Sequence, residues 1–159
     1  MLLSEQAYKK IDREVAKFPA DQKQSAVMAA LTIAQDETRW LMPEVMQEVA
    51  DYLGMPAIAV QEVATFYNMY HTTSVGKFKI SVCTNLPCAL SGGEKAAHYL
   101  KHKLGIDYKQ TTADDQFTLV EGECMGACGD APVMLVNNKR MCSMMSDAKI
   151  DALVEELKK

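Results

Sequence analysis

Residues 77–88 read Lys77-Phe-Lys-Ile-Ser-Val-Cys-Thr-Asn-Leu-Pro-Cys88, and the sequence changes character at this stretch. Apolar Phe78, Ile80 and Val82 alternate with polar residues, and this period of two indicates a half-buried β-strand. Two cysteines, at positions 83 and 88, follow the alternating residues. Before this stretch apolar residues recur at helical spacing, whereas strand and helix patterns alternate after it. The stretch therefore divides the chain into a helical part and an α/β part.

The first 75 residues are predicted to form a bundle of four short helices. The first begins behind a capping residue at Ser4 and ends by Pro19, and the second begins near Asp21. The other two begin at Pro43 and Pro56, because proline at the first turn loses no helical hydrogen bond. The side chains expected to face the core are Tyr8, Ile11, Val15, Phe18, Val27, Met28, Leu31, Ala34, Val45, Met46, Val49, Tyr52, Leu53, Val60, Val63, Phe66 and Tyr67.

Residues 76–159 are predicted to combine strands and helices. A helix over 91–104 has Ser91 and Glu94 in capping-box spacing and Gly105 as its end. Further strands are expected at 117–121, 132–136 and 140–143, before a final helix at 147–157. This order predicts helices packed on a small mixed sheet. The whole chain is therefore expected to be α+β, with an N-terminal helical bundle at 1–75 and an α/β domain at 76–159.

Charge and hydropathy exclude several classes of function. The net charge of -4 leaves no basic excess for neutralising phosphates, so we expect no nucleic acid partner. The first twenty residues carry many charges and lack the apolar core of a signal peptide. The longest mostly apolar stretch, residues 26–34, is too short to cross a membrane. We expect a cytoplasmic protein without direct membrane insertion, in which thiols stay reduced unless they bind metal.

Four of the five cysteines form two pairs, and each pair follows a predicted strand. Both loops can then leave the sheet at one edge, where four thiolates would converge. Zinc sites commonly space cysteines by two residues, whereas the gaps here are four and three residues. A 2Fe-2S cluster takes four thiolates, and wider loops suit this larger group. The pattern favours a cluster over structural zinc or ordinary buried thiols, with the candidate ligands Cys83, Cys88, Cys124 and Cys128.

Other polar residues near the cysteine pairs are less decisive. Reduction adds negative charge to a centre that already carries four thiolates, so nearby carboxylates would make it harder to reduce. The carboxylates flanking the second pair, Glu121, Glu123 and Asp130, fit this role or that of a solvated rim. Cys142 has no paired neighbour, and its role stays open. Histidine ligation is not expected, because all three histidines lie outside the two loops: His71, His98 and His102.

Several motifs accompany the cysteine pairs. They are Glu62-Val-Ala-Thr-Phe-Tyr67, Val75-Gly-Lys77, Phe117-Thr-Leu-Val120, and Glu123-Cys-Met-Gly-Ala-Cys128 ahead of Ala131-Pro132. Together with the domain order, they resemble the small 2Fe-2S subunit family of NADH:quinone oxidoreductase, respiratory complex I. The resemblance runs from about residue 5 to the C-terminus. It is weakest at 141–146, where relatives more often show an aromatic residue and a Thr-Pro helix start, and this departure leaves the four cysteines untouched.

The resemblance implies a thioredoxin-like 2Fe-2S ferredoxin domain in which Cys83, Cys88, Cys124 and Cys128 bind one cluster. It further implies an electron-transfer subunit of a multi-subunit NADH dehydrogenase, placed in the peripheral arm of a membrane-associated complex. A larger partner would bind FMN and NADH and exchange single electrons with the cluster. We expect this partner to dock partly through the N-terminal helices. The chain shows no nucleotide fingerprint and no catalytic residue of its own, so NADH is expected to bind elsewhere.

Two alternatives remain from the sequence. The same parts would serve the equivalent diaphorase subunit of an NAD-linked hydrogenase or formate dehydrogenase. A different class is a structural zinc module that only mediates assembly. A freely diffusing ferredoxin is less favoured, because it would not need the helical bundle ahead of its first strand.

Overall fold

The computed structural model describes residues 1–159, which divide into two compact units, Met1–Ser74 and Val75–Lys159. This division lies within one residue of the boundary expected from the sequence, and the assignment of the two units as separate domains stays a prediction. None of the helices combines the length and the apolar character that a membrane crossing needs.

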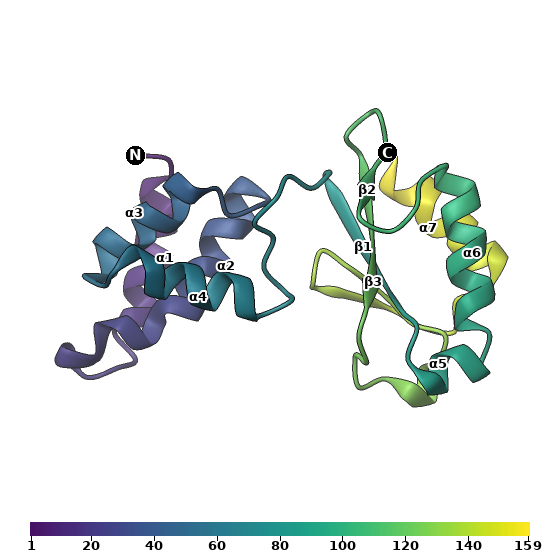
Figure 1. Ribbon diagram of the computed structural model, residues 1–159, viewed down its shortest axis with the longest axis horizontal. Coiled ribbons are helices and arrows are strands. Elements are labelled where there is room, and N and C mark those ends of the chain that lie inside the picture. Colours follow the sequence, from purple (N-terminus) through teal and green to yellow (C-terminus); the bar gives the residue numbers. More distant parts are fainter. The chain divides into compact units, whose positions relative to one another are not determined.

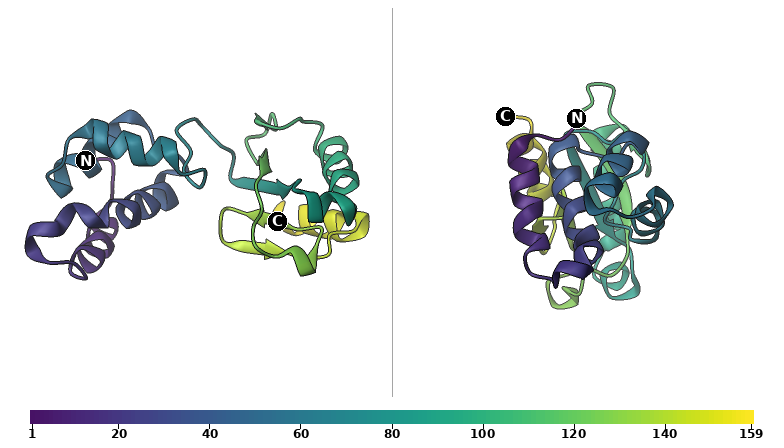
Figure 2. Two further views of the ribbon diagram at one scale, coloured as in Figure 1. Left: turned by 60° about the horizontal axis from the view of Figure 1, so that its bottom comes forward. Right: turned by 90° about the vertical axis from the view of Figure 1, so that its left-hand side faces the viewer.

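The first unit is entirely helical, and Figures 1 and 2 show its helices from three directions. The side chain of Ser4 accepts a hydrogen bond from the Ala7 amide and caps the first helix as predicted. Pro43 begins another helix, which ends at Gly54 in the left-handed region at φ 68°. The predicted bundle is confirmed, and its elements are α1 (Glu5–Val15), η1 (Ala20–Ala26), α2 (Val27–Thr38), α3 (Pro43–Leu53) and α4 (Ala57–Phe66).

The second predicted helix begins later than expected. Residues 20–26 form a 3-10 helix in which Gln22 leaves helical geometry, and the α-helix starts only at Val27. The segment Ala20–Ala26 is mostly polar and buries only Ala26. Short helices depend on packing of an apolar face for their stability, and this segment has almost none.

Three aromatic residues that were expected in the core are exposed instead. Phe66 is 80% exposed, because α4 buries Val60 and Ala64. A residue two positions beyond Ala64 lies about 200° around the helix and faces outward. Phe18 is 39% exposed, since α1 ends at Val15 before the helical stripe reaches it. Tyr67, which directly follows the last residue of α4, is also 39% exposed. The assignment of these three side chains to the core was therefore wrong.

A carboxylate holds the N-terminal segment of this unit against α3. Glu48 accepts hydrogen bonds from the Leu2 and Leu3 amides at 2.7 and 3.1 Å and from the Tyr8 hydroxyl at 2.5 Å. Burial, followed by this hydrogen bond, raises the pKa of Tyr8. The largest fully buried apolar side chains of this unit's core include Ile11, Leu31, Leu41, Val45, Val49 and Val60.

The second unit is built on a mixed sheet of five strands in the order β2-β3-β1-β4-β5. Strands β1 and β3 are parallel neighbours, and the other pairs are antiparallel. The predicted small mixed sheet is confirmed. Its elements are β1 (Phe78–Cys83), α5 (Leu86–Leu90), α6 (Gly93–Leu104), β2 (Gln110–Thr111), β3 (Phe117–Gly122), η2 (Cys128–Asp130), β4 (Met134–Val136), β5 (Arg140–Cys142) and α7 (Asp147–Leu157).

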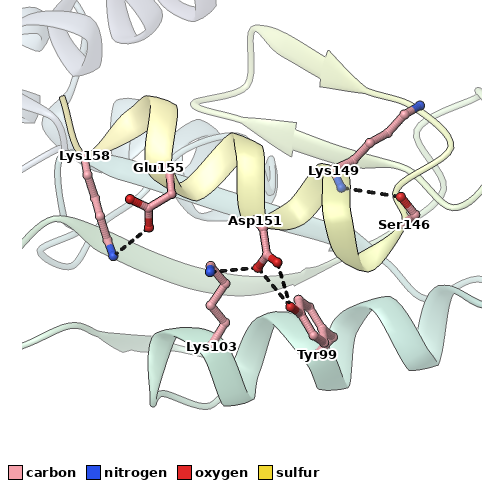
Figure 3. Close-up of polar contacts among 7 residues, drawn as sticks. All are labelled: Tyr99, Lys103, Ser146, Lys149, Asp151, Glu155 and Lys158. Carbon is pink, nitrogen blue, oxygen red and sulfur yellow. Dashed lines mark hydrogen bonds and ion pairs between the residues drawn. The ribbon is translucent and has the colours of Figure 1, made fainter.

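Helices α6 and α7 lie side by side on one face of this sheet (Figure 1). Their apolar sides enclose a core that includes Ile80, Leu100, Leu119, Met134 and Ile150. A polar contact links the two helices at the surface (Figure 3): Tyr99 donates to both Asp151 oxygens at 2.9 and 3.0 Å, and Lys103 Nζ lies 2.7 Å from Oδ1. The hydrogen bond from Lys103, more than that from Tyr99, lowers the pKa of Asp151.

The predicted capping box at the start of α6 is not formed. The residue before α6 is Gly92, which provides no side-chain cap. Ser91 instead ends the short helix α5, where its amide donates to the carbonyls of Pro87 and Cys88. Five residues are too few for a helical period to be visible in the sequence, so α5 was not predicted. Ser91, which the capping-box spacing had assigned to the start of α6, therefore lies at the end of α5.

Candidate metal centre

Both cysteine loops begin at the same end of the sheet. In the parallel register between β1 and β3, Cys83 lies opposite Gly122, and Cys124 follows two residues later. The Cys83 amide donates to the Val133 carbonyl at 3.2 Å, and the Thr84 amide to the Gly122 carbonyl at 3.5 Å. The expectation that both loops leave one edge of the sheet is confirmed.

The first cysteine pair is buried and held by three elements. Cys83 ends β1 and is 2% exposed, and Cys88 lies in α5 and is 1% exposed. Gly93, the first residue of α6, packs against the backbone between them: a Cβ here would lie 2.7 Å from the Cys88 carbonyl oxygen and 3.2 Å from that of Cys83. Such an approach requires glycine. The first loop is therefore fixed between β1, α5 and α6.

The second cysteine pair is open to solvent. Cys124 and Cys128 are both exposed, and their sulfur atoms are 3.7 Å apart. The chain turns between them at Gly126, whose φ of 73° lies in the left-handed region that favours glycine. Cys128 then begins the short helix η2. This pair is already close together, but no helix or strand covers it in the way that α5 and α6 enclose the first pair.

The thiols of the two pairs influence one another. Burial raises the pKa of Cys88, and a hydrogen bond with Cys83 and the charges of Cys83 and Cys128 raise it further. The pKa of Cys128 is raised mainly by its hydrogen bond with Cys124 and by the charge of Cys124, with a smaller effect of Cys83. Thiols that oppose each other's ionisation become thiolates most readily when metal ions supply positive charge.

The donor set fits a cluster of two irons. The protein has no group of three or more histidine, cysteine, aspartate or glutamate side chains arranged to hold a metal ion as they stand. Its four neighbouring thiols instead form a buried pair and an exposed pair, and all five cysteines are free. A 2Fe-2S cluster takes four thiolates, two for each iron. Two pairs at one end of a sheet match this requirement.

Cys142 lies outside both loops. It is 8% exposed in β5, among the apolar residues between the sheet and the helices α6 and α7. Burial raises its pKa. Its surroundings are those of a core residue, since a free cysteine in a protein interior packs as a small hydrophobic side chain.

Three residues near the thiols were not singled out in the sequence. Gly93 is needed for the close approach of α6, and the Gly92-Gly93 doublet was the only signal for it. Thr84 and Asn85, between the first two cysteines, contact the segment that leads into the second pair. These contacts join segments far apart in the sequence, so they depend on the register between β1 and β3. The sequence alone did not predict that register.

A model of the family described as thioredoxin-like [2Fe-2S] ferredoxin matches residues 11–158. The chain belongs to the thioredoxin-like [2Fe-2S] ferredoxin family. The ferredoxin is 40% identical over 143 residues to an NADH-quinone oxidoreductase subunit from Rickettsia typhi, covering 89% of this chain and 84% of the relative. It is also 40% identical over 148 residues to an NADH-quinone oxidoreductase subunit from Rhizobium meliloti, covering 93% and 86% of the two chains.

Among solved structures, the ferredoxin is similar to an NAD+-reducing [NiFe]-hydrogenase with a TM-score of 0.73 and 24% identity. The match covers 83% of this chain and 22% of the hydrogenase chain, so the ferredoxin spans about a fifth of that protein's length. At this identity the likeness concerns the fold alone. The helices and the mixed sheet agree with the expected architecture. The family match confirms that the protein is a thioredoxin-like iron-sulfur ferredoxin.

Proposed function

We propose that this ferredoxin is the small electron-transfer subunit of an NADH-quinone oxidoreductase. One 2Fe-2S cluster would be held by Cys83, Cys88, Cys124 and Cys128. The observation that carries the proposal is the arrangement of β1 and β3, two parallel neighbours that bring both cysteine pairs to one end of the sheet. Relatives that are about 40% identical to this chain are named as subunits of NADH-quinone oxidoreductase, which supports this assignment of the parent complex.

The two pairs would hold the cluster in different surroundings. Cys83 and Cys88 lie with Val133 in a small apolar cluster, against which Met125 and Ala127 pack, and these side chains keep water from the inner thiolates. Cys124 and Cys128 stand at the surface, where a redox partner can approach. When bound, the cluster supplies storage for a single electron. The chain's contribution is to keep one side dry and the other accessible.

The electron donor or acceptor would be FMN on a larger partner subunit, which also binds NADH. No nucleotide fingerprint is present in this chain. The N-terminal helices would dock that partner and place the ferredoxin in the peripheral arm of the complex. The exposed apolar side chains of α4 support this role, because Ile58 is 62% and Phe66 80% exposed.

Two alternatives define the experiments. A diaphorase subunit of an NAD-linked hydrogenase or formate dehydrogenase would use the same parts, and the fold likeness to the hydrogenase does not separate it from the main proposal. A structural zinc module would also use four thiols. The subunits that co-purify with the full chain distinguish the first alternative, since only NADH-quinone oxidoreductase joins to membrane subunits.

The decisive test of the cofactor is metal and sulfide analysis of the full chain purified without oxygen. We expect two irons and two sulfides per chain and a reddish-brown colour. Replacing any of the four proposed ligands with alanine should remove the cluster. Cys142→Ala is the control and should keep it. Stoichiometric zinc, or loss of the visible spectrum in Cys142→Ala alone, would reject the assignment.

The docking role is tested by co-purification with the flavin-binding partner. Changing Ile58 and Phe66 to serine should weaken the association without loss of the cluster. Phe18→Ser is a matched control, because Phe18 is an exposed aromatic residue of the same unit outside α4. Equal retention of both variants on the partner would contradict docking through α4.

A further inference from the structure

Two polar contacts join the cysteine loops outside the sulfur atoms. Thr84 donates its hydroxyl hydrogen to Glu121 Oε1 at 2.8 Å. Asn85 donates from Nδ2 to Glu123 Oε2 at the same distance of 2.8 Å. The two donors lie directly after Cys83, and the two acceptors lie shortly before Cys124. Each contact therefore joins the segment of one cysteine pair to that of the other.

The side chain of Asn85 takes part in this contact instead of its usual local role. Asn85 occupies the N-cap position of α5, where asparagine commonly accepts a hydrogen bond from the helix backbone. It makes no such capping bond. Its amide group reaches across to Glu123, which is 38 positions away in the sequence. The geometry thus favours the contact between the loops over the local cap.

The two contacts are also stronger than hydrogen bonds between neutral side chains. Both acceptors are carboxylates, and hydrogen bonds to ionised groups are about twice as strong as those between neutral groups. The backbone adds only one bond between these segments beyond the strand register, from Thr84 to Gly122 at 3.5 Å. Glu121 is already held in β3, whereas Glu123 lies past the end of that strand. The contact from Asn85 therefore adds to the fixation of the exposed second loop, and the contact from Thr84 ties the first loop to the end of β3.

We propose that Thr84, Asn85, Glu121 and Glu123 form a polar clasp that sets the separation of the two cysteine pairs and lowers the reduction potential of the cluster they bind. This inference rests on the proposed function. The four are positioning residues, since they act through the loops and do not bind the cluster. Reduction adds one electron from an external donor and hence one negative charge, and the fixed carboxylates oppose that charge.

The first experiment follows the clasp without a cluster. In the full chain produced without iron, the Asn85 side-chain amide is observed by NMR. We expect Glu123→Ala to move this amide signal and to speed its exchange with water, whereas Glu123→Gln, which keeps an oxygen acceptor, largely restores both. If Glu123→Ala left both the position of the Asn85 amide signal and its exchange rate unchanged, the clasp would be overturned. This result does not depend on whether the protein binds iron.

The second experiment measures how fast the loaded protein loses its cluster to a chelator, followed by visible absorption. Removing the donors with Thr84→Val and Asn85→Ala should speed the loss by about tenfold together. Asp130→Asn is the matched control: it removes a carboxylate near Cys128 whose side chain contacts Ser143 and none of the four clasp residues. A rate within twofold of the unchanged protein, or equal acceleration by Asp130→Asn, would overturn the positioning role.

The third experiment measures the reduction potential by redox titration with electron paramagnetic resonance. Glu123→Gln should keep the cluster and shift the equilibrium toward the reduced form by roughly threefold to tenfold, up to about 59 mV for one electron. Asn85→Ala keeps the charge and should not raise the potential. An unchanged potential in Glu123→Gln would overturn the electrostatic part. If the unchanged protein held no 2Fe-2S cluster, the proposed function would fail, while the NMR result would still decide whether the clasp exists.

Discussion

The two cysteine loops differ in how the fold holds them. The first is enclosed by β1, α5 and α6, and its thiols are almost completely buried. The second turns through Gly126 at the surface, and both of its thiols are exposed. The fold therefore holds one side of the site in place and leaves the other side accessible from solvent. Substitutions in the first loop should therefore affect the fold, and those in the second should affect contacts and reactivity.

The largest difference is expected between two glycines. In Gly93→Ala the new Cβ would meet the Cys88 carbonyl oxygen at 2.7 Å, so α6 or the loop must move. We expect a loss of about 3 kcal/mol in the free energy of unfolding, measured by chemical denaturation. In Gly129→Ala the Cβ meets nothing within 4 Å, and the change should stay within about 0.5 kcal/mol. Equal losses of stability in the two variants would show that the first loop is no more tightly held than the second.

A second prediction concerns Lys79, which lies in β1 four residues before Cys83 and is 3% exposed. Burial lowers its pKa from 10.5 to about 8, although Nζ donates to Asn138 Oδ1 at 2.7 Å. The unfolded chain then binds more protons than the folded chain between these two values. Stability should therefore rise as the pH increases from about 8 to 10.5, by about 3 kcal/mol from this group.

Lys79→Met should abolish this rise in stability, as seen in denaturation curves collected across the pH range. The variant should leave the cysteine loops unchanged, because Lys79 points its amine toward Asn138 in the turn between β4 and β5. A pH profile identical to that of the unchanged protein would show that Lys79 does not carry the effect.

A third prediction compares thiol reactivity in the full chain without a cluster. Exposed Cys124 and Cys128 should be alkylated at least about tenfold faster than buried Cys83 and Cys88, because access controls the reaction along with thiolate content. Mass spectrometry of peptides taken at timed intervals measures each rate. Similar rates at all four positions would show that the first loop opens as readily as the second.

The smallest effect is expected away from both loops. Asp151→Asn weakens the surface contact with Lys103 and Tyr99 between α6 and α7, and exposed ion pairs contribute little. We expect only a small loss of stability, seen as a slight fall in the midpoint of thermal unfolding. The ratio of the alkylation rates should stay the same. A change in that ratio would mean that the fixation of the first loop depends on how α6 meets α7.

The sequence predicted the elements whose signals are local. Alternation at Phe78, Ile80 and Val82 located β1, and Pro43 with Gly54 located α3. Spacing alone also placed both cysteine pairs after strands, which is enough to bring them together once β1 and β3 are neighbours. These features depend on residues close together in the chain.

The sequence failed where the outcome depends on neighbours in space. The apolar character of Phe66 suggested burial, but the direction in which α4 faces its neighbours leaves the ring outside. Ser91 and Glu94 had the spacing of a capping box, yet α5 takes Ser91 as its end. The contact between Asn85 and Glu123 required the register of two distant strands. Periodicity and spacing carry none of this information.

The placement of the two cysteine pairs on separate strands has a consequence for biosynthesis. Cys88 leaves the ribosome 36 positions before Cys124, and the whole of α6 is made in between. At the usual rate of about 5–20 residues per second, the first loop waits roughly 2–7 s for the second. During that interval the nascent chain offers only two of its four thiols. Metallation of the four proposed ligands must therefore follow synthesis of Cys128, when β3 can already pair with β1.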